Sequence, residues 1–364
     1  MEQESQKKTI RIKFMDGCPA DAYVKPFYRE LSRFYNVEYS DQPDYVIFGV
    51  FGEEHLAYNN CVKICYAGEC IVPDFNLCDY AMGNHYISFG DRYFRYPVWY
   101  IYNRESTLLM QKKHEDVEGI LSRKTDFCSF VVSNGGADPI RQAAFEALSA
   151  YKRVNSGGRF LNNIGQPEGV ADKLEFDKKH KFSLAFENQS HPGYVSEKLI
   201  DAFAAQTVPI YWGDPTVAEA FNPKAFINVH DFESLESLVD YVKKVDEDDE
   251  LYMEMLRQPA LLNRSDYLDE KQLALEAFLR NIFDQDREKA FRRSMRHWEA
   301  RYQEYRLKTW KQTRIFRRID RFRRRIDKFC RAIFLVIRKL IVAVVGEETY
   351  CNMRDKVKKL RRMA

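Results

Sequence analysis

The chain has 364 residues, enough for two domains of ordinary size, and its 45% hydrophobic and 30% charged residues exclude a disordered or low-complexity protein. It contains no uninterrupted apolar run of about 18 residues, which argues against an ordinary transmembrane helix. The charged start, MEQESQKK, argues against a secretory signal, so we expect a cytoplasmic protein whose eight cysteines are reduced thiols.

Charge is divided unevenly along the chain. The net charge is only +3, but residues 291–364 carry 24 Lys and Arg against 7 Asp and Glu, while the preceding residues carry 33 against 47. An acidic body with a strongly basic tail indicates that the tail meets a polyanion or an anionic membrane surface.

The first part of the chain is predicted to form a parallel sheet. Short β-rich runs at residues 10–14, 45–50, 62–66 and 86–89 are separated by helix-like or loop segments such as residues 20–35. Strands that alternate with helices in this way form parallel sheets covered on both faces.

A polar, lysine-rich stretch, residues 111–125, interrupts this pattern and is interpreted as a linker. The alternation then resumes, with expected strands at 127–133, 182–186, 208–212 and 226–229 and expected helices at 140–151, 196–205, 235–245, 251–262 and 270–283. Two such modules predict two facing Rossmann-like domains with a cleft between them, over residues 1–125 and 126–290.

Residues 291–364 are predicted to form a basic, amphipathic helical tail. One apolar stripe steps by three and four residues through Ile319, Phe322, Ile326, Phe329 and Ile333, with arginines on the other faces. Residues 332–345 are almost wholly apolar but shorter than a bilayer span. This pattern favours a helix lying on an anionic membrane surface, so we expect a peripheral protein on the cytoplasmic face of the membrane.

Other roles for the tail stay open. It could pack on the body, or the stripe could pair two tails as a coiled coil in a homodimer. Nucleic acid is the least favoured partner, because nothing else in the chain resembles a nucleic-acid-binding module.

The most informative segment for function is residues 182–215, FSLAFENQSHPGYVSEKLIDAFAAQTVPIYWGDP. A buried strand runs into polar residues, a Pro-Gly turn and a helix start with Ser196 as a plausible N-cap. Lys198 in the first helical turn opposes the helix dipole, which indicates that it serves an anionic ligand such as a pyrophosphate. A plain strand–turn–helix unit with a surface lysine is the alternative that the residues alone leave open.

The motifs resemble one known family. F-E-N-x-x-x-x-x-Y-V-S-E-K at residues 186–198, followed by V-P-I-Y-W-G at 208–213, resembles the donor-binding signature of the α1,3/4-fucosyltransferases, glycosyltransferase family 10. The resemblance extends to Pro139-Ile140-Arg141 and, in the first module, to Tyr66-Ala67-Gly68-Glu69 as it stands in bacterial members. It covers about residues 60–235 in unbroken order.

The resemblance implies an α/β fold of the GT-B type and an inverting transfer of L-fucose from GDP-β-L-fucose. The acceptor would be O3 of GlcNAc in an N-acetyllactosamine-type glycan, giving a Lewis X-like product. The C-terminal module would hold the nucleotide and the N-terminal module most of the acceptor. The basic tail is likewise similar to the membrane-associating C-termini of bacterial members.

Residue roles follow only where the motifs match. The resemblance implies that Glu69 is the general base and that Arg141 and Lys198 are the cations at the pyrophosphate. It also implies that Asn188, Tyr194 and Glu197 line the donor site. Without the flanking motif, Glu69 would read as an ordinary solvated loop carboxylate. Cys70-Ile71 follow it in place of the more usual Asn-Glu, and the spacing around Arg159 differs from the family pattern, so Arg159 receives no role.

No obligatory metal or other cofactor is expected. A GT-A fold would need an Asp-x-Asp at a strand end, but the matches at residues 246–248 and 284–286 do not follow predicted strands. Cys61, Cys65, Cys70 and Cys78 cluster at spacings that do not fit a paired CxxC zinc site and are read as buried thiols. His191 and His230 are expected to be structural or to lie beside ligand.

Two other functions compete with this hypothesis. One is a GT-B transferase for another nucleotide sugar or acceptor, including α1,4 linkage or a glucose acceptor. The other is a membrane- or carbohydrate-binding protein without catalysis. The sequence carries no readable code for acceptor identity or oligomeric state.

Overall fold

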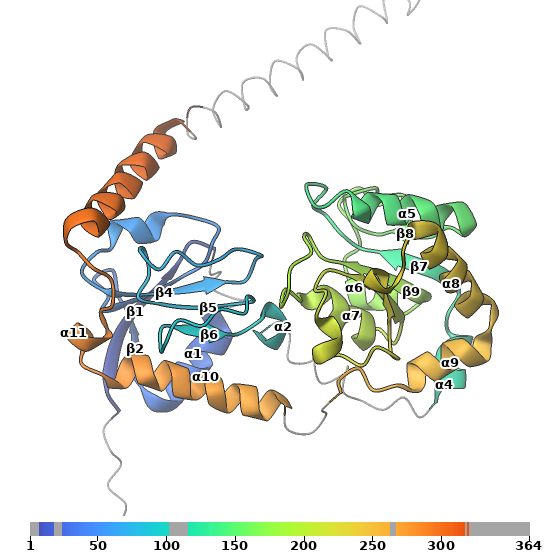
Figure 1. Cartoon of the computed structure of the whole chain (residues 1–364), viewed down its shortest axis with the longest axis horizontal. Coiled ribbons are helices and arrows are strands. Elements are labelled where there is room, and N and C mark those ends of the chain that lie inside the picture. Colours follow the sequence, from blue (N-terminus) through green and yellow to red (C-terminus); the bar gives the residue numbers. More distant parts are fainter. Residues whose placement is uncertain (1–6, 18–23, 102–115, 263–266, 317–318, 320–364) are drawn as a thin grey trace, which may run out of the picture. The chain divides into compact units, whose positions relative to one another are not determined.

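The computed structural model describes residues 7–17, 24–101, 116–262, 267–316 and 319. The chain divides into two compact units, Met1–Met295 and Arg296–Ala364. The first unit contains two separate parallel sheets, each accompanied by helices (Figure 1). We call each sheet with its packed helices a lobe. The α/β architecture predicted from the alternating pattern is confirmed.

The first lobe is built on a six-stranded sheet in which every neighbouring pair is parallel. In spatial order its strands are β2 (Asn36–Tyr39), β1 (Thr9–Met15), β3 (Tyr45–Phe48), β4 (Val62–Ala67), β5 (Tyr80–Gly83) and β6 (Tyr93–Arg95). The central strands β3 and β4 are buried along their whole length, which is why they read as continuous apolar runs. The segments between these strands and directly after β6 add α1 (Val24–Phe34), η1 (Glu54–Ala57) and α2 (Val98–Ile101).

The strand expected at residues 86–89 is wrong. This stretch lies in the loop between β5 and β6, and its aromatic residues Tyr86 and Phe89 are 54% and 43% exposed. The sheet instead continues through two short strands on either side of it. Tyr86, Ile87 and Phe89 give this stretch the apolar, β-rich composition of a strand, although both aromatic side chains are exposed.

The second lobe is built on a five-stranded parallel sheet. In spatial order its strands are β11 (Ile227–Asn228), β10 (Val208–Trp212), β9 (His180–Phe186), β7 (Asp126–Phe130) and β8 (Val154–Ser156). Its helices are α4 (Val117–Ser122), α5 (Ile140–Tyr151), α6 (Lys173–Asp177), α7 (Glu197–Ala204), η2 (Val217–Glu219), η3 (Val229–Asp231), α8 (Leu235–Glu247) and α9 (Asp249–Arg257).

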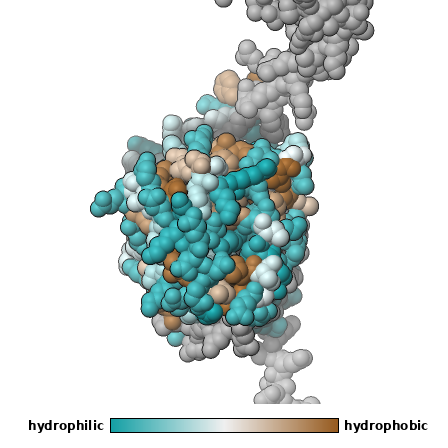
Figure 2. All heavy atoms as spheres, turned by 90° about the vertical axis from the view of Figure 1, so that its right-hand side faces the viewer, coloured by the Kyte–Doolittle hydropathy of each residue, from teal (hydrophilic) through white to brown (hydrophobic). Residues whose placement is uncertain are grey.

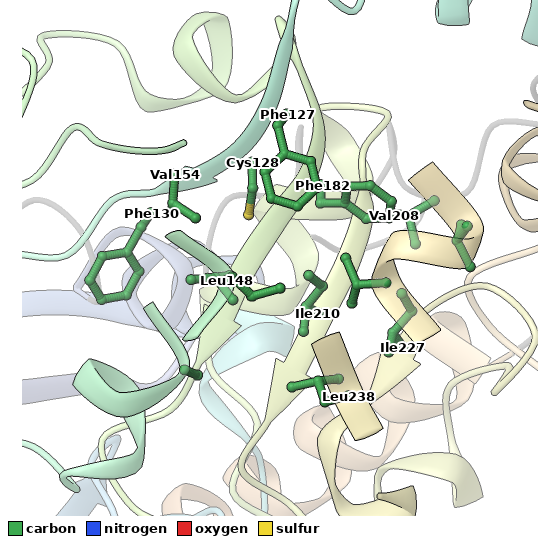
Figure 3. Packing of buried hydrophobic residues seen from close by; sticks show 14 of the residues in the cluster. Phe127, Cys128, Phe130, Leu148, Val154, Phe182, Val208, Ile210, Ile227 and Leu238 are labelled. Carbon is green, nitrogen blue, oxygen red and sulfur yellow. The ribbon is translucent and has the colours of Figure 1, made fainter. Parts of the chain in front are cut away.

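Apolar side chains from strands and helices meet in the core of the second lobe (Figure 3). Phe182 of β9 and Ile210 of β10 pack there with Leu148 of α5 and Leu238 of α8, all fully buried. This rigid sheet positions the loops at its carboxyl edge. The outer face seen in Figure 2 is mainly hydrophilic with scattered apolar residues, the ordinary composition of a domain surface.

Two helices, at residues 117–122 and 267–284, pack against a different lobe from the one that the sequence predicted. Part of the predicted linker forms α4, whose Val117 and Ile120 are buried in the second core. Helix α10 (Tyr267–Asp284), expected to close the second module, packs with the first sheet instead. Figure 1 shows α10 alongside α1 of the first lobe. The apolar period of a helix identifies its buried face but not the sheet that covers it.

The boundary of the tail is also shifted. After α11 (Arg287–Ala290), Arg293 donates from Nε to Asp79 Oδ2 at 3.0 Å, and both side chains are fully buried in the first lobe. The second compact unit therefore begins at Arg296 rather than at residue 291. The other predicted limit, at residue 125, stays a prediction.

In the tail unit, residues 297–316 are helical and Ile319 continues the helix. Trp298 and Phe316 are 63% and 69% exposed on it. Four members of the predicted stripe, Phe322, Ile326, Phe329 and Ile333, and the apolar run 332–345 lie outside the described residues. Within the part of the chain that is described, no helix is both long and apolar enough to cross a membrane.

Candidate active site

The turn between β9 and α7 is organised by one buried carboxylate. Glu187 directly follows β9 and is fully buried. It accepts hydrogen bonds from Ser196 N at 2.7 Å, from Ser196 Oγ at 2.6 Å and from Lys198 Nζ at 3.1 Å. Ser196 is the N-cap of α7, as predicted. Glu187 therefore fixes the start of the helix and the position of its lysine.

Lys198 is held as a cation at the first turn of α7. Burial alone would lower the pKa of its ammonium group, but the carboxylates of Glu187 and Glu197 outweigh burial and raise that pKa above its ordinary value. The ammonium group also donates to Ser196 Oγ at 2.9 Å and lies 3.5 Å from Glu197 Oε1. Burial would raise the pKa of Glu197, but Lys198 and Lys173 lower it.

Arg141 lies under the same edge of the sheet, at the start of α5. Only 2% of it is exposed. One terminal nitrogen donates to Phe186 O and to Asn188 Oδ1, both at 2.8 Å, and the other donates to Asn134 O at 3.2 Å. Its Nε is buried without a hydrogen-bond partner among the described residues. Burial lowers the pKa of this guanidinium, which Glu187 opposes, and the group stays a cation.

Glu69 belongs to the first lobe, in the loop that follows β4. Asn84 Nδ2 donates to the backbone carbonyls of Gly68 at 3.1 Å and Glu69 at 3.2 Å, which fixes the path of this loop. The Glu69 carboxylate accepts a hydrogen bond from the hydroxyl of Tyr194, 3.2 Å from Oε2. Tyr194 belongs to the second lobe and is 2% exposed. Burial and the adjacent carboxylates raise its pKa, so its hydroxyl is a proton donor to Glu69.

A glycine turn brings Tyr194 to the first lobe. Gly193 has φ +86°, and a Cβ atom there would lie 2.5 Å from Asn84 O. Its own carbonyl accepts a hydrogen bond from Arg95 of the first lobe at 3.3 Å. The guanidinium of Arg95 stacks on the ring of Tyr86, 4.1 Å from its centroid. Only glycine combines this backbone angle with so close an approach.

The structure brings the six predicted site residues together. Arg141, Tyr194 and Lys198 each interact with Glu187 by hydrogen bonding or Coulomb interaction. Asn188 accepts a hydrogen bond from Arg141, and Glu197 lies beside Lys198. Glu69 joins them through Tyr194. The motif pattern missed Glu187 as the centre of the group, although its place directly after a buried strand was a usable signal.

The sequence assigned no firm role to His191, His230 and Arg159. His230 stacks on Trp212 with ring centroids 6.0 Å apart, and its Nε2 lies 3.2 Å from Gly213 O, so it is a packing and hydrogen-bonding residue. Arg159 is exposed. His191 contacts His85 of the first lobe, with ring centroids 4.4 Å apart.

The cysteines of the first lobe separate into two environments. Cys61, Cys65 and Cys78 are buried, as predicted. Cys70 is only half-buried and lies beside Glu69. Burial, together with the carboxylates of Glu187 and Glu69, raises the pKa of the Cys70 thiol.

A cavity of about 220 Å³ lies between residues of the two lobes. The first lobe contributes Tyr86, Arg95 and Trp99, while Asp214 and Thr216 are among the residues from the second. None of the six predicted site residues lines it, so we assign it no part in the chemistry described above.

Comparison with known proteins agrees with these motifs. Residues 12–102 match the family model described as "Alpha-(1,3)-fucosyltransferase FucT N-terminal domain", and residues 121–258 match "Glycosyltransferase family 10 (fucosyltransferase) C-term". A crystal structure of an α1,3-fucosyltransferase is 32% identical, with a TM-score of 0.66, over 79% of this chain and 93% of that one. The chain belongs to glycosyltransferase family 10. Its two parallel sheets with flanking helices are the GT-B architecture of this family.

Other relatives support the same family. The α-(1,3)-fucosyltransferase FucT of Helicobacter pylori is 34% identical over 281 residues, which is 66% of this chain and 58% of that protein. The crystal structure of an α1,3-fucosyltransferase with GDP-fucose is 30% identical, with a TM-score of 0.63, over 81% of this chain and 95% of that one. The chain spans between about two fifths and three fifths of the length of the curated relatives that it matches.

Proposed function

We propose that this family 10 member transfers L-fucose from GDP-β-L-fucose to O3 of GlcNAc in an N-acetyllactosamine-type acceptor, with inversion and without an obligatory metal. Membership of the family and the solved relative with GDP-fucose support the donor. The contact between Glu69 and Tyr194 is the observation that carries the proposal, because it joins a first-lobe carboxylate to the donor-binding motif of the second lobe.

Glu69 is the general base in this proposal. Its carboxylate takes the proton of the acceptor hydroxyl while that oxygen forms a bond to the anomeric carbon of fucose. The bond between this carbon and the β-phosphate oxygen breaks, and GDP leaves with the electron pair. Attack from the face opposite GDP requires the base and the diphosphate site to lie on opposite sides of the sugar. Glu69 in one lobe and Arg141 and Lys198 in the other suit that requirement.

Arg141 and Lys198 stabilise the charge that develops on the leaving diphosphate. Fixed cationic donors in a partly buried site do this without a metal ion. Arg141 has a buried N–H at Nε that finds no acceptor among the residues that the structure describes. Lys198 has two short contacts, to Glu187 and Ser196, and a longer one to Glu197 at 3.5 Å. A diphosphate oxygen would replace the Glu197 contact while Glu187 keeps the ammonium group in place.

Asn188, Tyr194 and Glu197 line the donor side in this proposal. Asn188 accepts from Arg141 and therefore orients the guanidinium beside the nucleotide. Tyr194 orients the base. Three competing functions would use the same fold: transfer of another sugar, transfer to another acceptor, and binding without catalysis. The following assay distinguishes them from the proposed function.

The purified chain is incubated with GDP-fucose, UDP-galactose or CMP-sialate, with and without N-acetyllactosamine. We expect that, of the three donors, only GDP-fucose releases its nucleotide, and that it does so only when acceptor is present. NMR should show a product with α-linked fucose on O3 of GlcNAc. A fucosylated product at O4 would overturn the linkage, release from another donor would overturn the donor, and donor binding without release would favour a non-catalytic protein.

We also propose that the tail unit holds the enzyme on the cytoplasmic face of an anionic membrane. The excess of 24 Lys and Arg over 7 Asp and Glu in residues 291–364 supports this location. Exposed Trp298, Tyr305 and Phe316 add the apolar surface that an interfacial helix buries among headgroups.

A further inference from the structure

Three metal-binding side chains outside the proposed catalytic set lie together beside Glu69. Cys70, His85 and His191 each offer a ligand atom, and these atoms all lie within 4.8 Å of one another. They come from three separate loops, the first two in the first lobe and the third in the second lobe. The sequence gives no sign of this group, because its members lie 15 and 106 positions apart.

His85 has an unsatisfied ring nitrogen. The residue is 4% exposed, and its Nδ1 is buried without a hydrogen-bond partner in the described part of the chain. Buried polar atoms in folded proteins are normally satisfied, and a bound ion is one of the standard explanations for an exception.

His191 is oriented as metal-ligating histidines are. Its Nδ1 lies 3.0 Å from the carbonyl oxygen of Pro192. When Nδ1–H donates to this carbonyl, Nε2 carries the free electron pair. A backbone carbonyl in this position fixes the tautomer and orientation of the ring in known metal sites.

The local charge also favours a cation. Glu69 directly precedes Cys70 in the chain, and its carboxylate and that of Glu187 act electrostatically on the Cys70 thiol. A divalent cation would convert the thiol to a thiolate, release its proton to solvent and offset the negative charge around it.

We propose that Cys70, His85 and His191 bind a thiophilic divalent cation such as Zn²⁺. One sulfur and two imidazole nitrogens suit zinc and cobalt rather than magnesium or calcium. Metal–ligand bonds of about 2.0–2.3 Å in a tetrahedron place ligand atoms about 3.3–3.6 Å apart, so the ligand atoms need to approach one another by at most about 1.5 Å. Water takes the fourth position. The ion supplies no step of the proposed transfer.

The bound ion inhibits fucose transfer, a consequence that rests on the proposed function. It ties the loop that bears Glu69 to the loop that bears Tyr194, so the lobes lose the freedom to admit and release substrates. Its positive charge also attracts the carboxylate of Glu69, which is directly adjacent to Cys70 in the chain.

Cobalt binding tests the site without any activity measurement. The reduced full-length chain is titrated with Co²⁺, whose complex with a thiolate absorbs by sulfur-to-metal charge transfer. We expect one equivalent to produce this band, Cys70→Ser to abolish it and His191→Ala to weaken affinity at least about tenfold. Cys128→Ala, which removes a buried thiol from the second core, serves as the matched control and should bind as the original chain does.

Two results would overturn the site. A charge-transfer band that survives in Cys70→Ser would place the metal on another cysteine, and a titration without the band would mean that the three side chains do not bind metal together.

Inhibition is measured separately. With GDP-fucose and acceptor, Zn²⁺ should lower turnover at least tenfold in the original chain and in Cys128→Ala, reversibly with a chelator, and leave Cys70→Ser unaffected. Equal inhibition of Cys70→Ser would overturn the inhibitory role. If no variant transfers fucose, the proposed function fails while the cobalt titration still decides the metal site.

Discussion

Glu187 is the residue on which the geometry of the proposed donor site depends. It is fully buried and accepts hydrogen bonds from Ser196 and Lys198 at the start of α7. The sequence pointed to Ser196 and Lys198, because a cap and a misplaced cation stand out in the first turn of a helix. It did not point to Glu187 as their common partner, because the pairing depends on how the turn folds back on the strand end.

Tyr194→Phe should weaken catalysis while leaving the fold intact. The substitution removes only the hydroxyl that donates to Glu69. A hydrogen bond to a charged group contributes about 1.5–3 kcal/mol, so turnover should fall about 10- to 100-fold if the bond holds the base in place. Steady-state kinetics with GDP-fucose and acceptor measure this.

Tyr252→Phe is the matched control for Tyr194→Phe. The buried hydroxyl of Tyr252 donates a hydrogen bond to Lys181 O at 2.7 Å in the second lobe. Lys181 is not one of the six predicted site residues. The control should lose stability but not turnover. Equal turnover in the two variants would contradict the positioning role of Tyr194.

Asp177 should give the second lobe a pH-dependent stability. Burial raises the pKa of this carboxyl to about 6, in spite of the nearby Lys173. Between its ordinary value near 4 and this raised value, the folded chain binds the proton more tightly than the unfolded chain does. Stability therefore falls as pH rises through this window, by about 3 kcal/mol in all, and levels off above pH 6.

Asp177→Asn should remove that slope. The thermal unfolding midpoint is followed from pH 4 to pH 7 in the original chain, in Asp177→Asn and in Asp240→Asn, which changes an exposed carboxylate. Only Asp177→Asn should lose the decline between pH 4 and pH 6. Parallel curves for all three would mean that Asp177 does not titrate in this range.

The turn before α7 depends on glycine for two separable reasons. Gly193→Ala places an L-residue at φ +86° and a Cβ atom 2.5 Å from Asn84 O, so the turn must move away from the first lobe. Since this turn carries Tyr194 to Glu69, kcat/KM for fucose transfer should fall at least about tenfold. The strained backbone should also lower the free energy of unfolding by about 1–2 kcal/mol.

Gly165→Ala separates backbone strain from the clash. Gly165 has φ +75°, but nothing lies within 4 Å of its added Cβ atom. It should lose stability by about 1–2 kcal/mol with unchanged kcat/KM. If both glycine variants keep full activity, the close contact between this turn and the first lobe is not needed for catalysis.

At the level of elements, the sequence predicted those with strong periodicity. The helix at residues 140–151 and the strand at 208–212 match α5 and β10. The three-residue β8 is too short to show a period, and it was missed. The apolar face of α10 was visible, but its packing against the first sheet was not, because both lobes offer an apolar surface of the same kind.

The candidate site as a whole could not be predicted from sequence periodicity alone. Alternating strands and helices predict where the carboxyl edge of each sheet lies, and the family motif selects residues along it. The meeting of Glu69 with Tyr194, and that of Cys70 and His85 with His191, join segments more than 100 residues apart. No local period encodes such contacts, so only the folded chain reveals them.

Deletion of residues 316–364 should separate membrane binding from catalysis. The truncated chain keeps both sheets and all six proposed site residues, so it should retain its turnover with soluble acceptor. Loss of the basic segment should abolish sedimentation with anionic liposomes and leave binding to neutral liposomes negligible in both chains. Unfolding of the truncated chain would mean that the tail is part of the core, and unchanged sedimentation would contradict the anchoring role.

Glu69→Gln tests the whole proposal most directly. The amide keeps the size of the side chain and the contact to Tyr194 but cannot accept the acceptor proton. Turnover with GDP-fucose and N-acetyllactosamine should fall about 10²- to 10⁴-fold, while the Kd for GDP stays within about twofold of the original chain. Glu168→Gln, an exposed carboxylate of the second lobe, should change neither quantity. Undiminished turnover in Glu69→Gln would contradict the assignment of this residue as the base.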